Sequence, residues 1–233
     1  EADEKPRHQV HLDAFFIDTH EVTVHDYAMC VAAYACPTPA CPKYGLECPW
    51  FNWSLPGHED HPLNSVNYLQ AEAYCTWKGA RLPTEAEWEK AARGGLDGKL
   101  HPWGSAAPTC TPGLNNSAVF APDEPGCGAG GTWPAGEGSA ANGFGLHDMA
   151  GNVLEWTADV YDAAFYGNSP ASNPLSPVEV RHPDPGLVYR VLRGGSAWND
   201  DPRHLRVSAR TSWNKLSYFP GVAVGFRCAR TAD

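Results

Sequence analysis

The stretch Leu82-Pro-Thr-Glu-Ala-Glu-Trp-Glu-Lys-Ala-Ala-Arg-Gly-Gly95 carries the clearest folding signal in this chain. Thr84 can accept a backbone hydrogen bond at the start of a helix, and Glu87 follows three residues later, which is the spacing of a capping box. Trp88 and the Ala-Ala pair after it share one face of that helix, and the two glycines end it. The sequence therefore predicts a helix that begins after Thr84 and packs through Trp88.

Two more helices and several strands are expected around this one. Thr23 can cap a helix over residues 24–33, and a second begins near Ser65 or Asn67 and stops at Gly79. Alternating or apolar patterns predict strands over residues 8–18, 151–159, 189–193, 205–210 and 222–230.

Composition limits the architecture and the partners of the 233-residue chain. With 23 glycines and 21 prolines, much of the backbone must be loop, and the nine tryptophans favour ordered loops over disorder. We expect a single α+β domain spanning residues 1–233, either monomeric or part of a larger chain. The net charge of −10 argues against a nucleic-acid partner held by bulk charge. No apolar run approaches the roughly 18 residues of a membrane span.

The eight cysteines predict an oxidising compartment, such as the periplasm, the cell surface or the extracellular space. Four of them form a proline-rich group that favours two disulfides, with a zinc site and free thiols as alternatives: Cys30, Cys36, Cys41 and Cys48. Cys110 and Cys127 bracket a long loop and predict a further bridge, whereas Cys75 and Cys228 each stand alone in the sequence.

Several motifs together resemble the formylglycine-generating enzyme family, the sulfatase-modifying factors. They occur in order along almost the whole chain: Glu21-Val-Thr-Val, His61-Pro-Leu-Asn-Ser-Val-Asn, residues 79–94, His101-Pro-Trp-Gly, residues 142–156, Arg193-Gly-Gly-Ser and Gly225-Phe-Arg. The resemblance implies a variant of the C-type lectin fold, with a small twisted antiparallel sheet, about three helices and abundant irregular loop.

Structural calcium is the cofactor that the resemblance implies. Calcium prefers carboxylate and carbonyl oxygens. The family pattern carried onto this chain gives a first site made of the Asp148 side chain, the Gly151 carbonyl, the Val153 carbonyl and the Glu155 side chain. A second site would use Asn115 and the Asn116 carbonyl with an acidic residue further on, unless a Cys110–Cys127 disulfide tethers this loop instead.

The family's oxidases work through two cysteines placed shortly after Gly-Gly-Ser, a thiol pair suited to soft Cu(I). In this chain Asn199 stands at the first position, Pro202 or His204 stands near the second, and no cysteine lies between Cys127 and Cys228. We therefore expect neither copper at these positions nor formylglycine formation.

The segment 196–224 mixes aromatic and short polar side chains, which is typical of a recognition surface. The predicted function is a non-redox ligand-binding domain, secreted or periplasmic, with a protein, peptide or glycan ligand; some of the aromatics can alternatively be core residues. The alternative function is an oxidoreductase or tailoring enzyme of the same fold. His58-Glu-Asp-His61 is read as a solvated loop, although it can also hold a metal. The predicted ligand-binding residues are Ser196, Trp198, Asn199, Asp201, Arg203, His204, Arg210, Trp213 and Tyr218.

Overall fold

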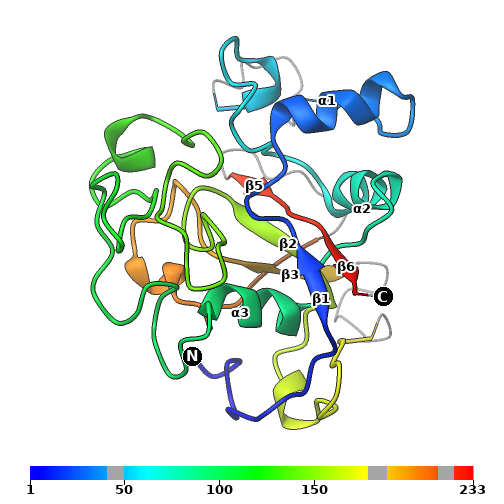
Figure 1. Ribbon diagram of the computed structural model, residues 1–233, viewed down its shortest axis with the longest axis vertical. Coiled ribbons are helices and arrows are strands. Elements are labelled where there is room, and N and C mark those ends of the chain that lie inside the picture. The colour runs from blue at the N-terminus through cyan, green and yellow to red at the C-terminus, as the bar shows by residue number, and fades with distance from the viewer. Residues whose placement is uncertain (41–49, 178–187, 215–222, 233) are drawn as a thin grey trace.

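Three helices and two sheets form the framework of the computed structural model, which describes residues 1–40, 50–177, 188–214 and 223–232. The helices are α1 (Val24–Ala32), α2 (Tyr68–Trp77) and α3 (Glu85–Arg93), and four short 3-10 helices lie in the loops. In Figure 1 the central sheet lies between α1 and α2 on one side and α3 on the other. The predicted α+β class, with three α-helices and abundant loop, is confirmed.

Each helix begins at the cap that the sequence predicts. Thr23 accepts a hydrogen bond from the Asp26 backbone, and Asn67 and Thr84 both complete capping boxes. Gly94 ends α3 in the left-handed conformation that glycine adopts at little cost. Local hydrogen bonding therefore determines all three starts.

The larger sheet is mixed, and the small antiparallel sheet that the resemblance implies is present as a second sheet. Its order is β4 (Thr211–Asn214), β3 (Tyr189–Arg193), β2 (Leu154–Val160) and β5 (Val224–Gly225). The β2–β5 pair is parallel, because the chain crosses the sheet between these strands instead of turning back through a hairpin. The smaller sheet pairs β1 (Phe15–Ile17) with β6 (Ala229–Thr231) in antiparallel fashion.

The strand expected over residues 205–210 does not form. A 3-10 helix occupies Pro202–Leu205, and the next strand begins only at Thr211. The Arg193 guanidinium donates to the carbonyls of Val207 and Ser208, so this backbone is bonded to a side chain rather than to a neighbouring strand. The patterns over residues 8–18 and 222–230 likewise yield shorter strands than expected.

The disulfides correct one reading of the cysteine pattern. Cys110 pairs with Cys127 as predicted, and Cys30 pairs with Cys36, which excludes a zinc site made from all four clustered cysteines. Cys75 and Cys228 do not stand alone, since they bond to each other and join α2 to the segment before β6. The partners of Cys41 and Cys48 lie outside the described residues.

The largest core cluster packs α1 and α2 onto the central sheet. Tyr27 of α1 stacks on Tyr74 of α2, and both rings contact Phe226 edge-on. On α3, Trp88 is fully buried against Met149 in a second cluster. In the described part of the chain, no helix is both long and apolar enough to cross a membrane.

Candidate functional site

The turn from Asp148 to Val153 has a backbone that L-residues rarely adopt. Asp148 and Asn152 have φ values of 56° and 60°, and Gly151 between them has 89°. Non-glycine residues persist in this region only where the surroundings fix them, and such strain concentrates at functional sites. Here the Asn152 side chain fixes the turn, because it accepts from the Trp133 backbone N–H and donates to the Trp133 carbonyl.

This turn carries a buried carboxylate and two buried backbone carbonyls. Asp148 is 2% exposed and accepts a hydrogen bond of 2.6 Å from the Gly136 backbone. No described residue donates a hydrogen bond to the carbonyls of Gly151 or Val153. The arrangement therefore offers free oxygen ligands of the kind that calcium prefers.

Glu155, the fourth predicted calcium ligand, is already engaged by a cation of the protein. Its carboxylate accepts two hydrogen bonds of 2.8 Å from Arg227 and a third from the indole nitrogen of Trp88. Both partners of the ion pair are fully buried. Because two of its oxygen lone pairs already face Arg227, Glu155 is a less available ligand than Asp148.

Glu21 is a buried acidic residue near this group that the sequence analysis did not single out. Its side chain is fully buried, and neither carboxylate oxygen has a hydrogen-bond partner among the described residues. Burial, together with the nearby charges of Asp148 and Glu155, raises the pKa of Glu21 far above its ordinary range. A signal was present in the sequence, since an acidic residue directly precedes the core residue Val22.

The buried cation Arg227 acts on all three carboxylates, those of Glu21, Asp148 and Glu155. Ionising all three in the interior would leave uncompensated negative charge, which is costly in a low dielectric. In the described residues no three His, Cys, Asp or Glu side chains are arranged to hold a metal by themselves. A cation at this position would therefore also need backbone carbonyls.

The second predicted calcium position is more exposed. Asn115 lies at the surface in the turn before Ser117. The Asn116 carbonyl accepts from the Thr109 backbone, and its side-chain amide donates to Ala107. The nearby Cys110–Cys127 disulfide also tethers this loop.

The Gly-Gly-Ser turn precedes and positions the segment in which the family's oxidases carry their thiols. Gly194 and Gly195 have φ values of 95° and 72°, and a Cβ on Gly195 would lie 2.8 Å from Leu205. The Asn199 side-chain oxygen accepts from the backbone and hydroxyl of Ser196. Asn199 thus closes the turn through hydrogen bonds, and every described cysteine lies in a disulfide.

Beside this turn, Trp198 borders a cavity of about 360 Å³. Two other tryptophans, Trp50 and Trp133, come from loops far away in the sequence. The remaining lining residues are Asn52, Leu55, His58, His61, Ala129, Gly130, Gly131, Thr132 and Pro134. The tryptophan pocket, as we call this cavity, has the size of a small-ligand site.

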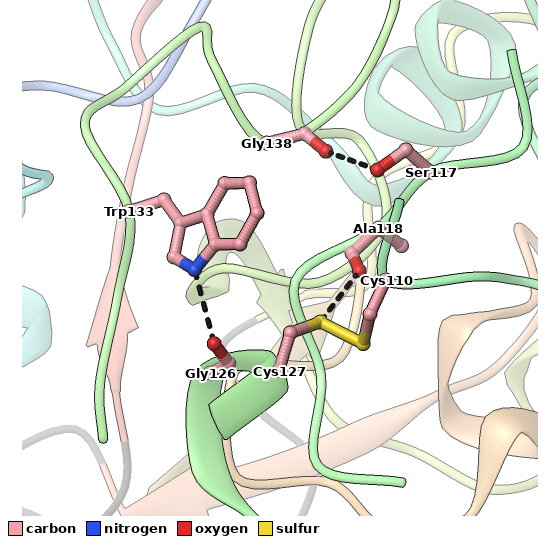
Figure 2. The surroundings of a disulfide bond; sticks show 7 residues. All are labelled: Cys110, Ser117, Ala118, Gly126, Cys127, Trp133 and Gly138. Atoms are coloured by element: carbon pink, nitrogen blue, oxygen red, sulfur yellow. Dashed lines mark hydrogen bonds between the residues drawn. A yellow bond between two sulfur atoms is a disulfide. The ribbon is translucent and has the colours of Figure 1, made fainter. Parts of the chain in front are cut away.

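The wall of the tryptophan pocket is tied to the Gly-Gly-Ser segment. The Gly126 N–H donates to the Ala197 carbonyl, and the Trp133 indole nitrogen donates to the Gly126 carbonyl. Figure 2 shows Trp133 with its indole nitrogen directed at Gly126, next to the Cys110–Cys127 disulfide. The disulfide therefore fixes the loop that carries one side of the pocket.

Two histidines also line the tryptophan pocket. The rings of His58 and His61 lie 4.2 Å apart between centroids. Burial and the neighbouring His58 lower the pKa of His61 to about 4. His61 is therefore neutral at physiological pH and offers hydrogen bonding to a ligand rather than charge.

The other predicted ligand-binding residues do not join the tryptophan pocket. Asp201 and Arg203 form an ion pair at the surface beside the exposed His204. Arg210 is buried in an ion pair with Glu85, and Trp213 packs against the main core cluster. Ser196 is fully buried, and Tyr218 lies outside the described residues.

Comparison with known proteins assigns this chain to a family. Residues 1–232 match the profile of the sulfatase-modifying factor enzyme 1-like domain. The chain belongs to this sulfatase-modifying factor family. The formylglycine-generating enzyme of Thermomonospora curvata is 34% identical over 97% of this chain and 85% of its own length.

Two further similar proteins carry different names. The mouse protein named inactive Cα-formylglycine-generating enzyme 2 is 35% identical over 73% of this chain, which corresponds to 49% of that relative. The structure of PvdO from Pseudomonas aeruginosa shares the fold, with 26% identity and a TM-score of 0.72 over all of this chain and 86% of PvdO. The sulfatase-modifying factor fold is thus shared by proteins with different names.

Proposed function

We propose that this sulfatase-modifying factor domain is a non-redox ligand-binding domain whose binding site is the tryptophan pocket. The observation that carries the proposal is the position of Trp198. The Gly-Gly-Ser turn sets its ring at the edge of the pocket, within 3.7 Å of a Cβ built on Gly131, and Trp50 and Trp133 line the same cavity.

The lining favours a neutral ligand with a flat ring. Tryptophan faces stack on rings and bury a large area, and no described residue of the lining is an arginine, lysine, aspartate or glutamate. Sugar rings of a glycan and aromatic side chains of a peptide both fit this chemistry. The hydroxyl of Thr132 and the histidines supply the few polar groups that orient a ligand.

The segment after the Gly-Gly-Ser turn lacks the thiols that formylglycine formation would use. Residues 196–204 contain no cysteine, and Asn199 is engaged with Ser196. The mouse relative named inactive provides a precedent for a family member without that activity. The disulfides support secretion or export to the periplasm, because they persist in oxidising compartments.

Replacing Trp198 with alanine should weaken binding of a ring-bearing ligand about 30-fold, as expected for a buried aromatic anchor. Tryptophan fluorescence would be followed while monosaccharides, short oligosaccharides and tyrosine-containing peptides are titrated separately. Trp77→Ala, on α2, provides a matched control because it removes an indole outside the pocket lining. Equal affinities of the wild type and Trp198→Ala for whichever probe binds, or binding of none of the probes, would contradict the proposal.

The alternative is an enzyme of the same fold, favoured by the 34% identity to a formylglycine-generating enzyme. The two functions are separated by supplying the protein with copper, oxygen and a thiol-containing peptide. We expect no aldehyde on the peptide. Aldehyde formation that depends on this chain would support the oxidase and refute the non-redox domain.

A structural calcium ion is also proposed for the buried acidic group. Asp148, the carbonyls of Gly151 and Val153, and Glu155 would hold it, and its charge would also act on the nearby buried carboxylate of Glu21, which is not one of the ligands. The unpartnered oxygens of Glu21 support this assignment, since a cation would offset their buried charge. Its role would be to fix the turn that positions β2. For the exposed Asn115 and Asn116 position, calcium stays a weaker proposal.

Calcium should raise the melting temperature of the wild type by about 5–10 °C at a hundredfold excess over its Kd, because binding then contributes about 3 kcal/mol. Asp148→Ala should lose this increment, and Glu21→Gln should reduce it, because it removes a nearby buried carboxylate. Differential scanning calorimetry with calcium or with a chelator measures it. The increment is the readout because alanine at the positive φ of Asp148 lowers stability by itself. A wild-type melting curve that a chelator leaves unchanged would refute the site.

A further inference from the structure

His58 and His61 line the tryptophan pocket and form a close pair of imidazoles. Their rings are tilted by 39° with centroids 4.2 Å apart, and both border the tryptophan pocket. They are separated by two residues in a short loop between the 3-10 helix Asn52–Ser54 and α2. Their proximity places two imidazole groups side by side in the lining of the cavity.

One ring nitrogen of each histidine is already held by an oxygen. His61 Nδ1 lies 3.0 Å from the Thr132 hydroxyl, and His58 Nδ1 lies 3.4 Å from the Pro56 carbonyl. Thr132 is itself fixed by the buried Asn52 amide at 2.8 Å. Metal-binding histidines usually have the second nitrogen held by an oxygen, which leaves Nε2 as the metal ligand.

The backbone that carries the pair is anchored at several points. The carbonyls of Glu59 and His61 accept hydrogen bonds of 2.9 Å from His25 and Val24 at the start of α1, and the Asp60 carbonyl accepts from Ala135. A turn bond joins His61 N–H to the His58 carbonyl. The two rings are therefore positioned before any ligand arrives, which lowers the entropy lost on binding.

We propose that His58 and His61 form an open two-histidine site for a late first-row divalent cation. Imidazole nitrogens suit Cu²⁺, Ni²⁺ and Zn²⁺, and Cu²⁺ should bind most tightly. In the described residues no third His, Cys, Asp or Glu completes the pair, so water or a ligand in the pocket fills the other positions. This site differs from a thiol-held Cu(I) centre, and it does not depend on the ligand-binding proposal.

The test uses the metal alone, with calcium present in excess to fill oxygen-based sites. Isothermal titration should give one tight Cu²⁺ per chain, and electron paramagnetic resonance should show coupling to two imidazole nitrogens. His58→Gln and His61→Gln should each weaken Cu²⁺ binding at least tenfold, and the double variant should lose the two-imidazole signal. The matched control is His25→Gln, because His25 is exposed on α1 outside the pair.

Two results would overturn the site. One is a two-imidazole signal that persists in the double variant, which would place Cu²⁺ on other histidines. The other is wild-type Cu²⁺ affinity no higher than that of the double variant. Melting curves of the apo-proteins show whether each variant is folded, and if one glutamine variant is not, Thr132→Val tests the same pair by releasing the His61 ring. Unchanged Cu²⁺ affinity in a folded Thr132→Val protein would also count against the proposed geometry.

Discussion

Replacing Glu155 with alanine should lower the free energy of unfolding by about 3–5 kcal/mol, because it leaves a buried arginine without its counter-charge. Arg227 is fully buried and donates two hydrogen bonds of 2.8 Å to this carboxylate. The indole nitrogen of Trp88 loses its acceptor in the same change. Urea denaturation followed by tryptophan fluorescence measures the loss.

A comparison with an exposed ion pair isolates the effect of burial. Asp201 bonds Arg203 at 2.6 Å on the surface, where water screens the charges. Asp201→Ala should therefore leave the unfolding midpoint nearly unchanged. A loss in Glu155→Ala no larger than in Asp201→Ala would show that Arg227 finds another partner. That outcome would contradict the proposal that the Glu155–Arg227 ion pair stabilises the fold.

Calcium must be controlled in this experiment, since Glu155 is also a proposed ligand. With a chelator present, the remaining difference between Glu155→Ala and the wild type reports the buried contacts of Glu155 with Arg227 and Trp88, without the metal. With calcium present, any additional loss reports the metal. Glu155→Gln keeps the side-chain shape and one hydrogen bond to Arg227, so its loss should be smaller than that of alanine.

The sequence predicted the helices well because their signals are local. Thr84 and Glu87 bond each other's backbone within one turn, so the capping box needs no information from the rest of the chain. The strand at residues 205–210 failed for the opposite reason. Its carbonyls are bonded by Arg193, and nothing in the local pattern indicates that contact.

The sequence predicted a candidate site only where a single continuous segment supplies its residues. The turn from Asp148 to Val153 is continuous in sequence, whereas Glu21 reaches it from a distant segment next to α1. Trp198 follows from the Gly-Gly-Ser motif, but Trp50 and Trp133 meet it only through the folding of separate loops. The spacing of residues in the sequence carries no information about contacts between separate loops.

Arg210 shows how a surface prediction fails. An arginine near aromatic residues is typical of a recognition surface, yet its guanidinium is bonded to Glu85 at the start of α3. This pair lies in a buried network that also includes Arg193. The charge therefore anchors α3 to the sheet, and binding variants at Arg210 would report stability as well as affinity.

Removing the Cys75–Cys228 disulfide should cost more stability than removing Cys110–Cys127. The first closes a separation of 153 residues and the second a separation of 17, which the chain-entropy model converts to about 5 and about 3 kcal/mol. Cys75 and Cys228 are also buried in the main core cluster, so alanine replacements leave a cavity there. Urea denaturation of the two double-alanine variants measures both losses.

The two disulfides should also differ in what they do to binding. Cys75→Ala with Cys228→Ala should lower stability while leaving the tryptophan pocket intact in the folded fraction. Cys110→Ala with Cys127→Ala releases the loop that carries Gly126 and Trp133, so it should weaken binding at temperatures where the protein remains folded. Equal stability losses in both variants would indicate that native packing, rather than loop closure, sets the contribution of each bridge. Because a link across 153 residues constrains the unfolded chain far more than the folded one, we expect the longer bridge to dominate.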